Sequence, residues 1–224
     1  MSDEKLIWEN RVFYYREECW EGPVLRSVLS EDSYRFKKCR LSDAKVILDI
    51  GGHIGSFAAF AAHLHPDKLI KTWEMVPGNF GYLLRNIEGL PNVEPHNGVV
   101  VGDETPKGFV VHPTNSGGSR VVWSPGGEPL TTVCKVTDIV DGPICFLKMD
   151  CEGSEHGIID SLVASGKIGL VDKMALEYHN FWGRTGDALR DTLIASGFKV
   201  ETHVYNPSCG LMWVYRNSWE GETA

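Results

Sequence analysis

Residues 46–55 read Val-Ile-Leu-Asp-Ile-Gly-Gly-His-Ile-Gly, and this stretch decides the fold. Its apolar half predicts a buried strand that ends near Asp49, and its glycines predict a tight turn. The Ala-rich segment 56–62 that follows is typical of a helix. A strand that leads through a glycine turn into a helix is how a parallel α/β sheet holds a nucleotide-like cofactor, because glycine lets the backbone approach the ligand closely.

The spacing of the glycines narrows the choice of cofactor. A dinucleotide fingerprint requires G-x-G-x-x-G, whereas His53 stands two positions after Gly51 and the pattern is D-x-G-x-x-x-G. Asp49, at the tip of the strand, would repel a pyrophosphate but favours a cationic or amino-bearing ligand. S-adenosylmethionine carries both an amino group and a sulfonium, so we expect Asp49 and the turn to hold its methionine part, with His53 shaping the turn or lining the pocket.

Composition indicates one globular domain with a well-buried core, since the chain has 224 residues, 42% hydrophobic and 23% charged. A net charge of −8 argues against a broad nucleic-acid footprint. No apolar run approaches the ~20 residues of a membrane helix, and the polar N-terminus lacks a signal-peptide pattern. The six cysteines include no C-x-x-C pair, so we expect free thiols and a cytoplasmic location. The oligomeric state stays open.

Strand and helix signals alternate from residue 45 onward, which predicts a mostly parallel sheet. We expect strands over 46–50, 69–74, 93–101, 144–149 and 173–177. Apolar stripes predict helices around 80–87, 158–163 and 189–193.

The remaining segments flank this alternation. Residues 1–44 are expected to be a lead-in, with a short strand and a short helix, that packs on the core, over its edge or its active site. Residues 45–224 would form the main domain. Within it, the glycine-rich segment 102–136 predicts an excursion of antiparallel hairpins, and 199–215 a final β-hairpin.

Polar residues at the ends of the next strands extend the predicted cofactor site. Glu74 ends the second strand 23 positions after Gly51, where a carboxylate would accept both ribose hydroxyls of an adenosine; the alternative is an acid that precedes the helix at Pro77. Asn79 would join the site or only cap that helix. Asn97 would meet the adenine edge or lie in a plain turn. The full predicted cofactor-binding set is Asp49, Gly51, Gly52, His53, Gly55, Glu74, Met75, Asn79, Asn97 and Asp150.

A later run, 144–155, carries the predicted chemistry. Lys148 interrupts an apolar strand and alternates onto one face with Asp150, and further acids crowd the carboxyl end of that strand, where ligands bind in open α/β sheets. A structural ion pair with helix N-terminal acids is the alternative. Glu177 and His179 end the fifth strand on one face, and a histidine there could serve as a general base.

Three segments, in this order, resemble the FkbM-type family of S-adenosylmethionine-dependent methyltransferases. They are LDIGGHIGSF at 48–57, WEMVPGNF at 73–80 with LLRN at 83–86, and LKMDCEGSE at 147–155 with LEYH at 176–179. The chain departs from the family in having Gly52 where alanine is usual, and in placing Pro77 two positions late. The resemblance implies a class I methyltransferase fold, a Rossmann-like three-layer α/β sandwich whose seven-stranded sheet is mostly parallel with an antiparallel last strand.

The resemblance also implies methyl transfer, most often to a hydroxyl oxygen, and we expect a small-molecule or sugar acceptor. The predicted catalytic set is Lys148, Asp150, Glu177 and His179, with His179 as the base. A variant that we do not favour holds a divalent cation, Mg²⁺ or Mn²⁺, on Asp150, Glu177 and His179. Two other functions stay open: a cofactor-binding module without chemistry, and a nicotinamide-dependent oxidoreductase, against which the position of His53 argues.

Overall fold

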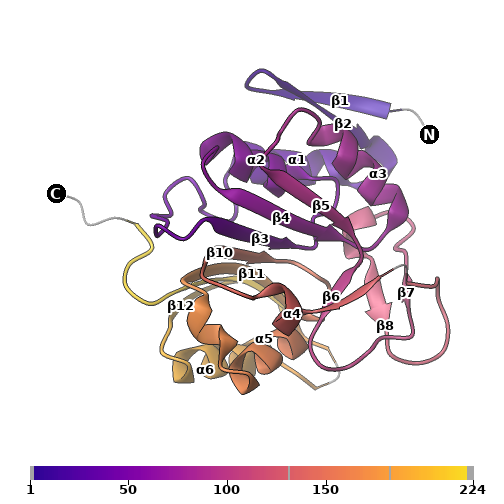
Figure 1. Ribbon diagram of the computed structural model, residues 1–224. Coiled ribbons are helices and arrows are strands. Elements are labelled where there is room, and N and C mark those ends of the chain that lie inside the picture. Colours follow the sequence, from indigo (N-terminus) through magenta and orange to yellow (C-terminus); the bar gives the residue numbers. More distant parts are fainter. Residues whose placement is uncertain (1–2, 131, 182, 221–224) are drawn as a thin grey trace.

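The computed structural model describes residues 3–130, 132–181 and 183–220, and its centre is a seven-stranded sheet of order β12-β13-β11-β10-β3-β4-β5 (Figure 1). The five strands β11, β10, β3, β4 and β5 run parallel to one another. The last strand in the sequence, β13, lies between β11 and β12 and runs antiparallel to both. This is the predicted fold. The strands are β3 Val46–Ile50, β4 Leu69–Glu74, β5 Val93–Asn97, β10 Ile144–Met149, β11 Lys173–His179, β12 Lys199–Asn206 and β13 Cys209–Tyr215.

Helices cover both faces of this sheet and complete the three layers (Figure 1). One face carries α1 Glu21–Leu29, α2 Ser56–Leu64 and α3 Pro77–Asn86, and the other carries α4 Val136–Ile139, α5 Glu155–Ala164 and α6 Gly186–Ala195. Residues 56–62 of α2 are all buried, because α2 lies between the sheet and α1. Small alanine side chains allow that close packing. Short 3₁₀ turns are η1 Glu17–Cys19, η2 Ser116–Gly118 and η3 Lys167–Leu170.

The segment expected as one strand over 93–101 is divided at Gly98. Its first part is β5, and its second part, β6 Val99–Val101, leaves the main sheet and pairs in parallel with β9 Val133–Lys135. The Gly98 amide still donates to the carbonyl of Glu74 on β4, whereas the next amide, that of Val99, donates to the carbonyl of Thr132, so the pairing partner changes at this point. A Cβ at Gly98 would lie 3.0 Å from the carbonyl oxygen of Thr132, which favours glycine there. The prediction of a single strand was therefore wrong.

Among its described residues, the excursion 102–136 forms one hairpin rather than several. Strands β7 Gly108–Val110 and β8 Arg120–Val122 pair antiparallel, as predicted, but β9 pairs in parallel with β6. Between β7 and β8 the chain forms η2, which lies over the carboxyl ends of the central strands.

The lead-in is a hairpin of β1 Asp3–Trp8 and β2 Arg11–Arg16, followed by α1 (Figure 1). The strand β1 was not predicted, since its sequence alternates charged and apolar residues only briefly. Phe13, Leu25 and Phe36 of the lead-in are fully buried in one hydrophobic cluster with α2. No helix within the described ranges is long and apolar enough to cross a membrane.

Asn86 joins the lead-in to the core and gives a test of this packing. It is fully buried; its Oδ1 accepts the Tyr14 amide at 2.8 Å, and its Nδ2 donates to the carbonyls of Tyr14 at 3.0 Å and Ile54 at 2.8 Å. We expect Asn86→Ala to lower the free energy of unfolding by about 2–4 kcal/mol in urea titrations, because three backbone groups lose their partner. Leu84→Ala, on the exposed side of the same helix, is the control; an equal loss in both variants would contradict this role.

Candidate functional site

A buried ion pair joins the two central strands beneath the glycine turn. Asp49 on β3 and Lys148 on β10 stand opposite each other in the ladder, and Lys148 Nζ lies 3.2 Å from Asp49 Oδ1. The hydroxyl of Thr72 donates to Asp49 Oδ2 at 2.8 Å, and Lys148 Nζ also donates to the carbonyl of Gly51. Burial lowers the pKa of Lys148, but the charges of Asp49 and Asp150 outweigh burial and raise this pKa above its ordinary value. Lys148 is therefore a fixed cation that holds the turn against β10.

The glycine turn owes its shape to the protein around it. Gly51 has a φ of +81°, and a Cβ there would lie 1.8 Å from the carbonyl oxygen of Asp150. A Cβ at Gly52 would lie 2.3 Å from Thr72 Oγ1, and Gly55, with a φ of +85°, faces Leu83. Only glycine fits these positions. The missing side chains thus allow neighbouring segments to approach, and the amides of Gly51 and Gly52 donate to the carbonyl of Trp73 on β4.

Glu74, at the end of β4, receives hydrogen bonds from the turn and from α3. Its Oε2 accepts the His53 amide at 2.9 Å, and its Oε1 accepts the Val76 amide at 2.8 Å and a longer contact from Asn79 Nδ2 at 3.4 Å. Burial raises the pKa of Glu74 to about 7 despite these donors. A carboxylate offers about four acceptor positions, so Glu74 keeps a free position on Oε2 and a weakly used one on Oε1.

A closed ring of polar contacts continues from Glu74 through segments far apart in the sequence. Asn79 accepts from Arg16, Arg16 is paired with the fully buried Glu21, and Glu21 Oε1 accepts the hydroxyl of Ser116 at 2.7 Å. Ser116 Oγ lies 2.6 Å from Nε2 of His53, whose amide returns the ring to Glu74. The ring joins the lead-in, the excursion, α3 and the glycine turn around one end of the cavity.

The ring also sets the tautomer of His53. Because the Ser116 hydroxyl donates its proton to Glu21, its oxygen accepts from His53, so the neutral imidazole carries its hydrogen on Nε2. Burial lowers the pKa of His53 to about 4, which keeps the ring neutral near pH 7.

A cavity opens at the carboxyl ends of β3, β4, β10 and β11, where ligands bind in open α/β sheets. Of the predicted cofactor residues, those on its wall are Gly51, Gly52, His53, Glu74, Met75 and Asp150. The others, Asp49, Gly55, Asn79 and Asn97, lie behind the wall. Asn97 Nδ2 donates to the carbonyl of Glu74, and Asn79 contacts its carboxylate, so both support Glu74.

Acidic groups dominate the charge of this cavity. Glu74, Asp150, Glu152 and Glu177 face it, and Lys148, which also lines it, is already paired with Asp49. Burial raises the pKa of Glu74 and Glu152 to about 7 and that of Glu177 to about 8. A cationic ligand, which favours the ionised carboxylates, is therefore preferred over an anionic one.

Part of the cavity wall is formed by residues that were not predicted from the sequence. Tyr34 of the lead-in lines the cavity, and its hydroxyl donates to Asp150 Oδ2 at 3.3 Å. The segment 115–117 of the excursion lines the opposite side. The signal for Ser116 was weak, because a serine among glycines is typical of any loop; only folding brings it to His53 and Glu21.

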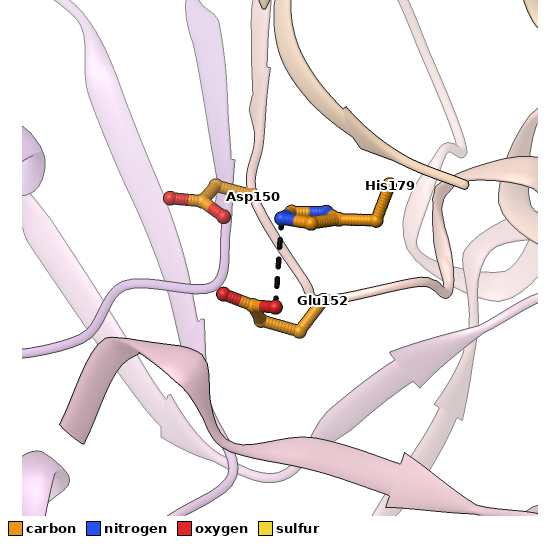
Figure 2. A group of neighbouring side chains, drawn as sticks. All are labelled: Asp150, Glu152 and His179. Carbon is orange, nitrogen blue, oxygen red and sulfur yellow. Dashed lines mark ion pairs between the residues drawn. The ribbon is translucent and has the colours of Figure 1, made fainter. Parts of the chain in front are cut away.

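Acids near the ends of β10 and β11 and at the start of α5 surround His179. Its Nδ1 lies 3.2 Å from Glu155 Oε1, and its Nε2 lies 3.4 Å from Glu152 Oε2 and 3.7 Å from Glu177 Oε1. Figure 2 shows the imidazole edge turned toward Glu152, with the Asp150 carboxylate beside it. One atom from each of Asp150, Glu152 and His179 lies within 4.8 Å of the others, a spacing that could hold a metal ion.

These neighbours change the expected role of His179. Burial alone lowers the pKa of His179, but Glu155 and Glu152 outweigh burial and raise this pKa to about 10. Burial and Asp150 raise the pKa of Glu177 to about 8, and burial raises that of Glu152 to about 7. This pKa favours the protonated imidazole near pH 7, which argues against the predicted role of His179 as a general base, and among the described residues His179 does not lie on the cavity wall.

Comparison with known proteins identifies the fold. No family model matches the chain. No curated protein matches either. Solved structures do match. One is Aeropyrum pernix fibrillarin with natively bound S-adenosyl-L-methionine, with a TM-score of 0.53 and 11% identity. The match covers 95% of this chain and 82% of the fibrillarin chain. An rRNA methylase from Streptococcus thermophilus has a TM-score of 0.51 at 13% identity, over 84% of this chain and 95% of its own.

A precorrin-6y C5,15-methyltransferase from Geobacter metallireducens is similar at a TM-score of 0.50 and 15% identity, over 83% of this chain and 88% of its own. At such identities the likeness shows the fold alone. The chain thus has the Rossmann-like fold of class I methyltransferases, in agreement with the order and direction of its strands.

The contribution of the Asp49–Lys148 ion pair to stability can be tested by substitution. We expect Lys148→Met to lower the free energy of unfolding by about 3–5 kcal/mol, because it leaves the Asp49 carboxylate buried without its cation. Adding Asp49→Asn should restore most of that loss. Urea unfolding of the wild type, both single variants and the double variant measures the coupling. Losses that simply add in the double variant would show that the pair has no such role.

Proposed function

We propose that the chain is an S-adenosylmethionine-dependent methyltransferase that acts on a hydroxyl group. The observation that carries the proposal is an acid-walled cavity at the carboxyl ends of the central strands of a methyltransferase-type sheet. The similar fibrillarin is described with S-adenosyl-L-methionine bound, and the other two similar proteins are described as methyl-transferring enzymes. The finer assignment to the FkbM-type family rests on the three sequence segments alone.

The residues on the wall fit this cofactor. Glu74, with free acceptor positions, would hold the ribose; the turn at Gly51–His53 would hold the methionine part; and 98–100 would face the adenine. Asp49, buried behind the wall, would support the methionine part through Lys148 and the turn. The acidic wall favours a ligand with a sulfonium and an amino group, and it disfavours the pyrophosphate of a nicotinamide dinucleotide.

When bound, S-adenosylmethionine supplies an electrophilic methyl group to an acceptor that must lose a proton. We assign the acceptance of that proton to Glu177, because its carboxylate faces the cavity whereas His179 lies behind it. Burial raises the pKa of Glu177 to about 8, so its ionised form, which can accept the proton, increases as the pH rises through 8. His179 would then orient Glu177 and Glu152 from behind. Asp150, held by Tyr34, would position the acceptor hydroxyl.

The acceptor that we propose is a small molecule or a sugar. A protein with a net charge of −8 and carboxylates at the mouth of its cavity repels a phosphate backbone. Phosphate contacts supply much of the affinity of nucleic-acid binding, so a polynucleotide acceptor is disfavoured even though one similar protein is named as an rRNA methylase.

Calorimetric titration with S-adenosylmethionine tests the proposal and the role of Glu74 together. Ribose hydroxyls donate to an ionised carboxylate, so binding favours the charged form of a group whose pKa is about 7 in the free protein. We therefore expect affinity to rise about tenfold between pH 6 and pH 8, with proton release below pH 7.

Glu74→Gln should weaken binding at least tenfold at pH 8 and leave little pH dependence. Glu94→Gln, an exposed carboxylate on the neighbouring strand β5, should behave as the wild type. Tight binding of NAD without binding of S-adenosylmethionine would overturn the proposal, and a pH dependence that survives Glu74→Gln would remove Glu74 from the ribose site.

Methyl transfer to a panel of hydroxylated small molecules tests the catalytic assignment. We expect Glu177→Gln to lower turnover by about 10²–10⁴-fold while the affinity for S-adenosylmethionine changes little, because the side chain would act on the acceptor. An exposed control is Glu201→Gln on β12. Undiminished turnover in Glu177→Gln would contradict its role as the base.

A further inference from the structure

The acids around His179 bring metal-ligating atoms from two strand ends to one point. Asp150 and Glu152 come from the turn after β10, and His179 ends β11. One donor atom of each lies within 4.8 Å of the others. Figure 2 shows the three side chains converging on one space between the two strand ends.

The burial and orientation of His179 support a cation at this point. The residue is only 7% exposed, and Nε2 makes no hydrogen bond among the described residues, its nearest acceptor being Glu152 Oε2 at 3.4 Å. The same nitrogen is directed at the space between Asp150 and Glu152 (Figure 2). Nε2 thus has carboxylates as its neighbours, with Glu177 Oε1 at 3.7 Å, and a divalent cation bound by such carboxylates would displace the proton from this nitrogen.

The second ring nitrogen, Nδ1, is held by a carboxylate, as is usual in a metal-binding histidine. Nδ1 faces Glu155, which is fully buried and accepts the amides of Cys151 at 3.0 Å and Gly153 at 2.9 Å. A carboxylate that holds the second nitrogen of a histidine sets the ring orientation and directs the first nitrogen at the metal. Glu155 therefore supports the imidazole from behind rather than belonging to the set of ligands.

We propose that Asp150, Glu152 and His179 bind one divalent cation at the acidic edge of the cavity. Two carboxylates and one imidazole suit Mn²⁺ or Mg²⁺ better than a thiolate-preferring metal. Glu152 takes the place that the sequence had given to Glu177, because its carboxylate lies within 4.8 Å of donor atoms of both Asp150 and His179.

The inference rests on the proposed function for its consequence. Three protein ligands leave positions open on the ion, and Asp150 and Glu152 both line the cavity, so an acceptor oxygen could complete the coordination. Coordination would lower the pKa of that hydroxyl, and its proton would pass to Glu177. The cation would thus select acceptors that present an oxygen donor.

Binding of Mn²⁺ itself tests the site without any substrate. Titration of the full chain with Mn²⁺, followed by the electron paramagnetic resonance signal of the free ion, should show one saturable site. We expect Asp150→Asn, Glu152→Gln and His179→Ala each to weaken binding at least tenfold, and Glu155→Gln, which only loosens the histidine, by about 10–100-fold. Asp187→Asn, a carboxylate on α6 with an 81% exposed side chain, is the matched control and should bind as the wild type.

Thermal unfolding of each variant shows whether it is folded, and Glu152→Gln, at a partly exposed side chain, keeps the test valid if His179→Ala does not fold. Absence of saturable binding at millimolar Mn²⁺ in the wild type, or equal affinity in Glu152→Gln and Asp187→Asn, would overturn the inference. Titration with S-adenosylmethionine in the presence of a chelator separates the two proposals. Cofactor binding without a Mn²⁺ site removes only the cation, whereas Mn²⁺ binding without cofactor binding removes the methyltransferase.

Discussion

The ion pair between Asp49 and Lys148 is the constraint on which the site depends. Both groups are buried at the centre of the sheet, where an unpaired charge would cost several kcal/mol. Lys148 also donates to the carbonyl of Gly51, so one ammonium joins β3, β10 and the glycine turn. Because the charge of Lys148 is paired inside the protein, it does not neutralise the acids on the cavity wall.

Around this pair, the cavity is completed by segments that do not belong to the parallel sheet. The lead-in brings Arg16 and Glu21, and the excursion brings Ser116, into one ring of contacts with Glu74 and His53. Each member of such a ring satisfies its neighbour, so loss of one leaves a buried polar group without a partner. Through this ring, the lead-in and the excursion shape and cover the end of the cavity where the ribose is proposed to lie.

Much of this arrangement can be predicted from the amino-acid sequence alone. The strand limits at 46–50, 69–74 and 144–149 were predicted as observed, because buried parallel strands are short apolar runs bounded by turn residues. The break at Gly98 and the parallel pairing of β9 were not, since both depend on contacts between residues distant in sequence. Among the residues predicted for the site, Glu74 and Asp150 line the cavity, and Asp49 lies behind its wall.

The sequence by itself determined the class of fold and the placement of acids at the strand ends, because the period of apolar residues and the spacing of glycines are local properties. Only the tertiary structure decided what each of those acids does. Whether a carboxylate pairs with a lysine, accepts backbone amides or surrounds an imidazole depends on which groups folding brings within a few ångströms. For that reason a histidine expected to be a base lies among acids, and Glu155 and Glu152 raise its pKa.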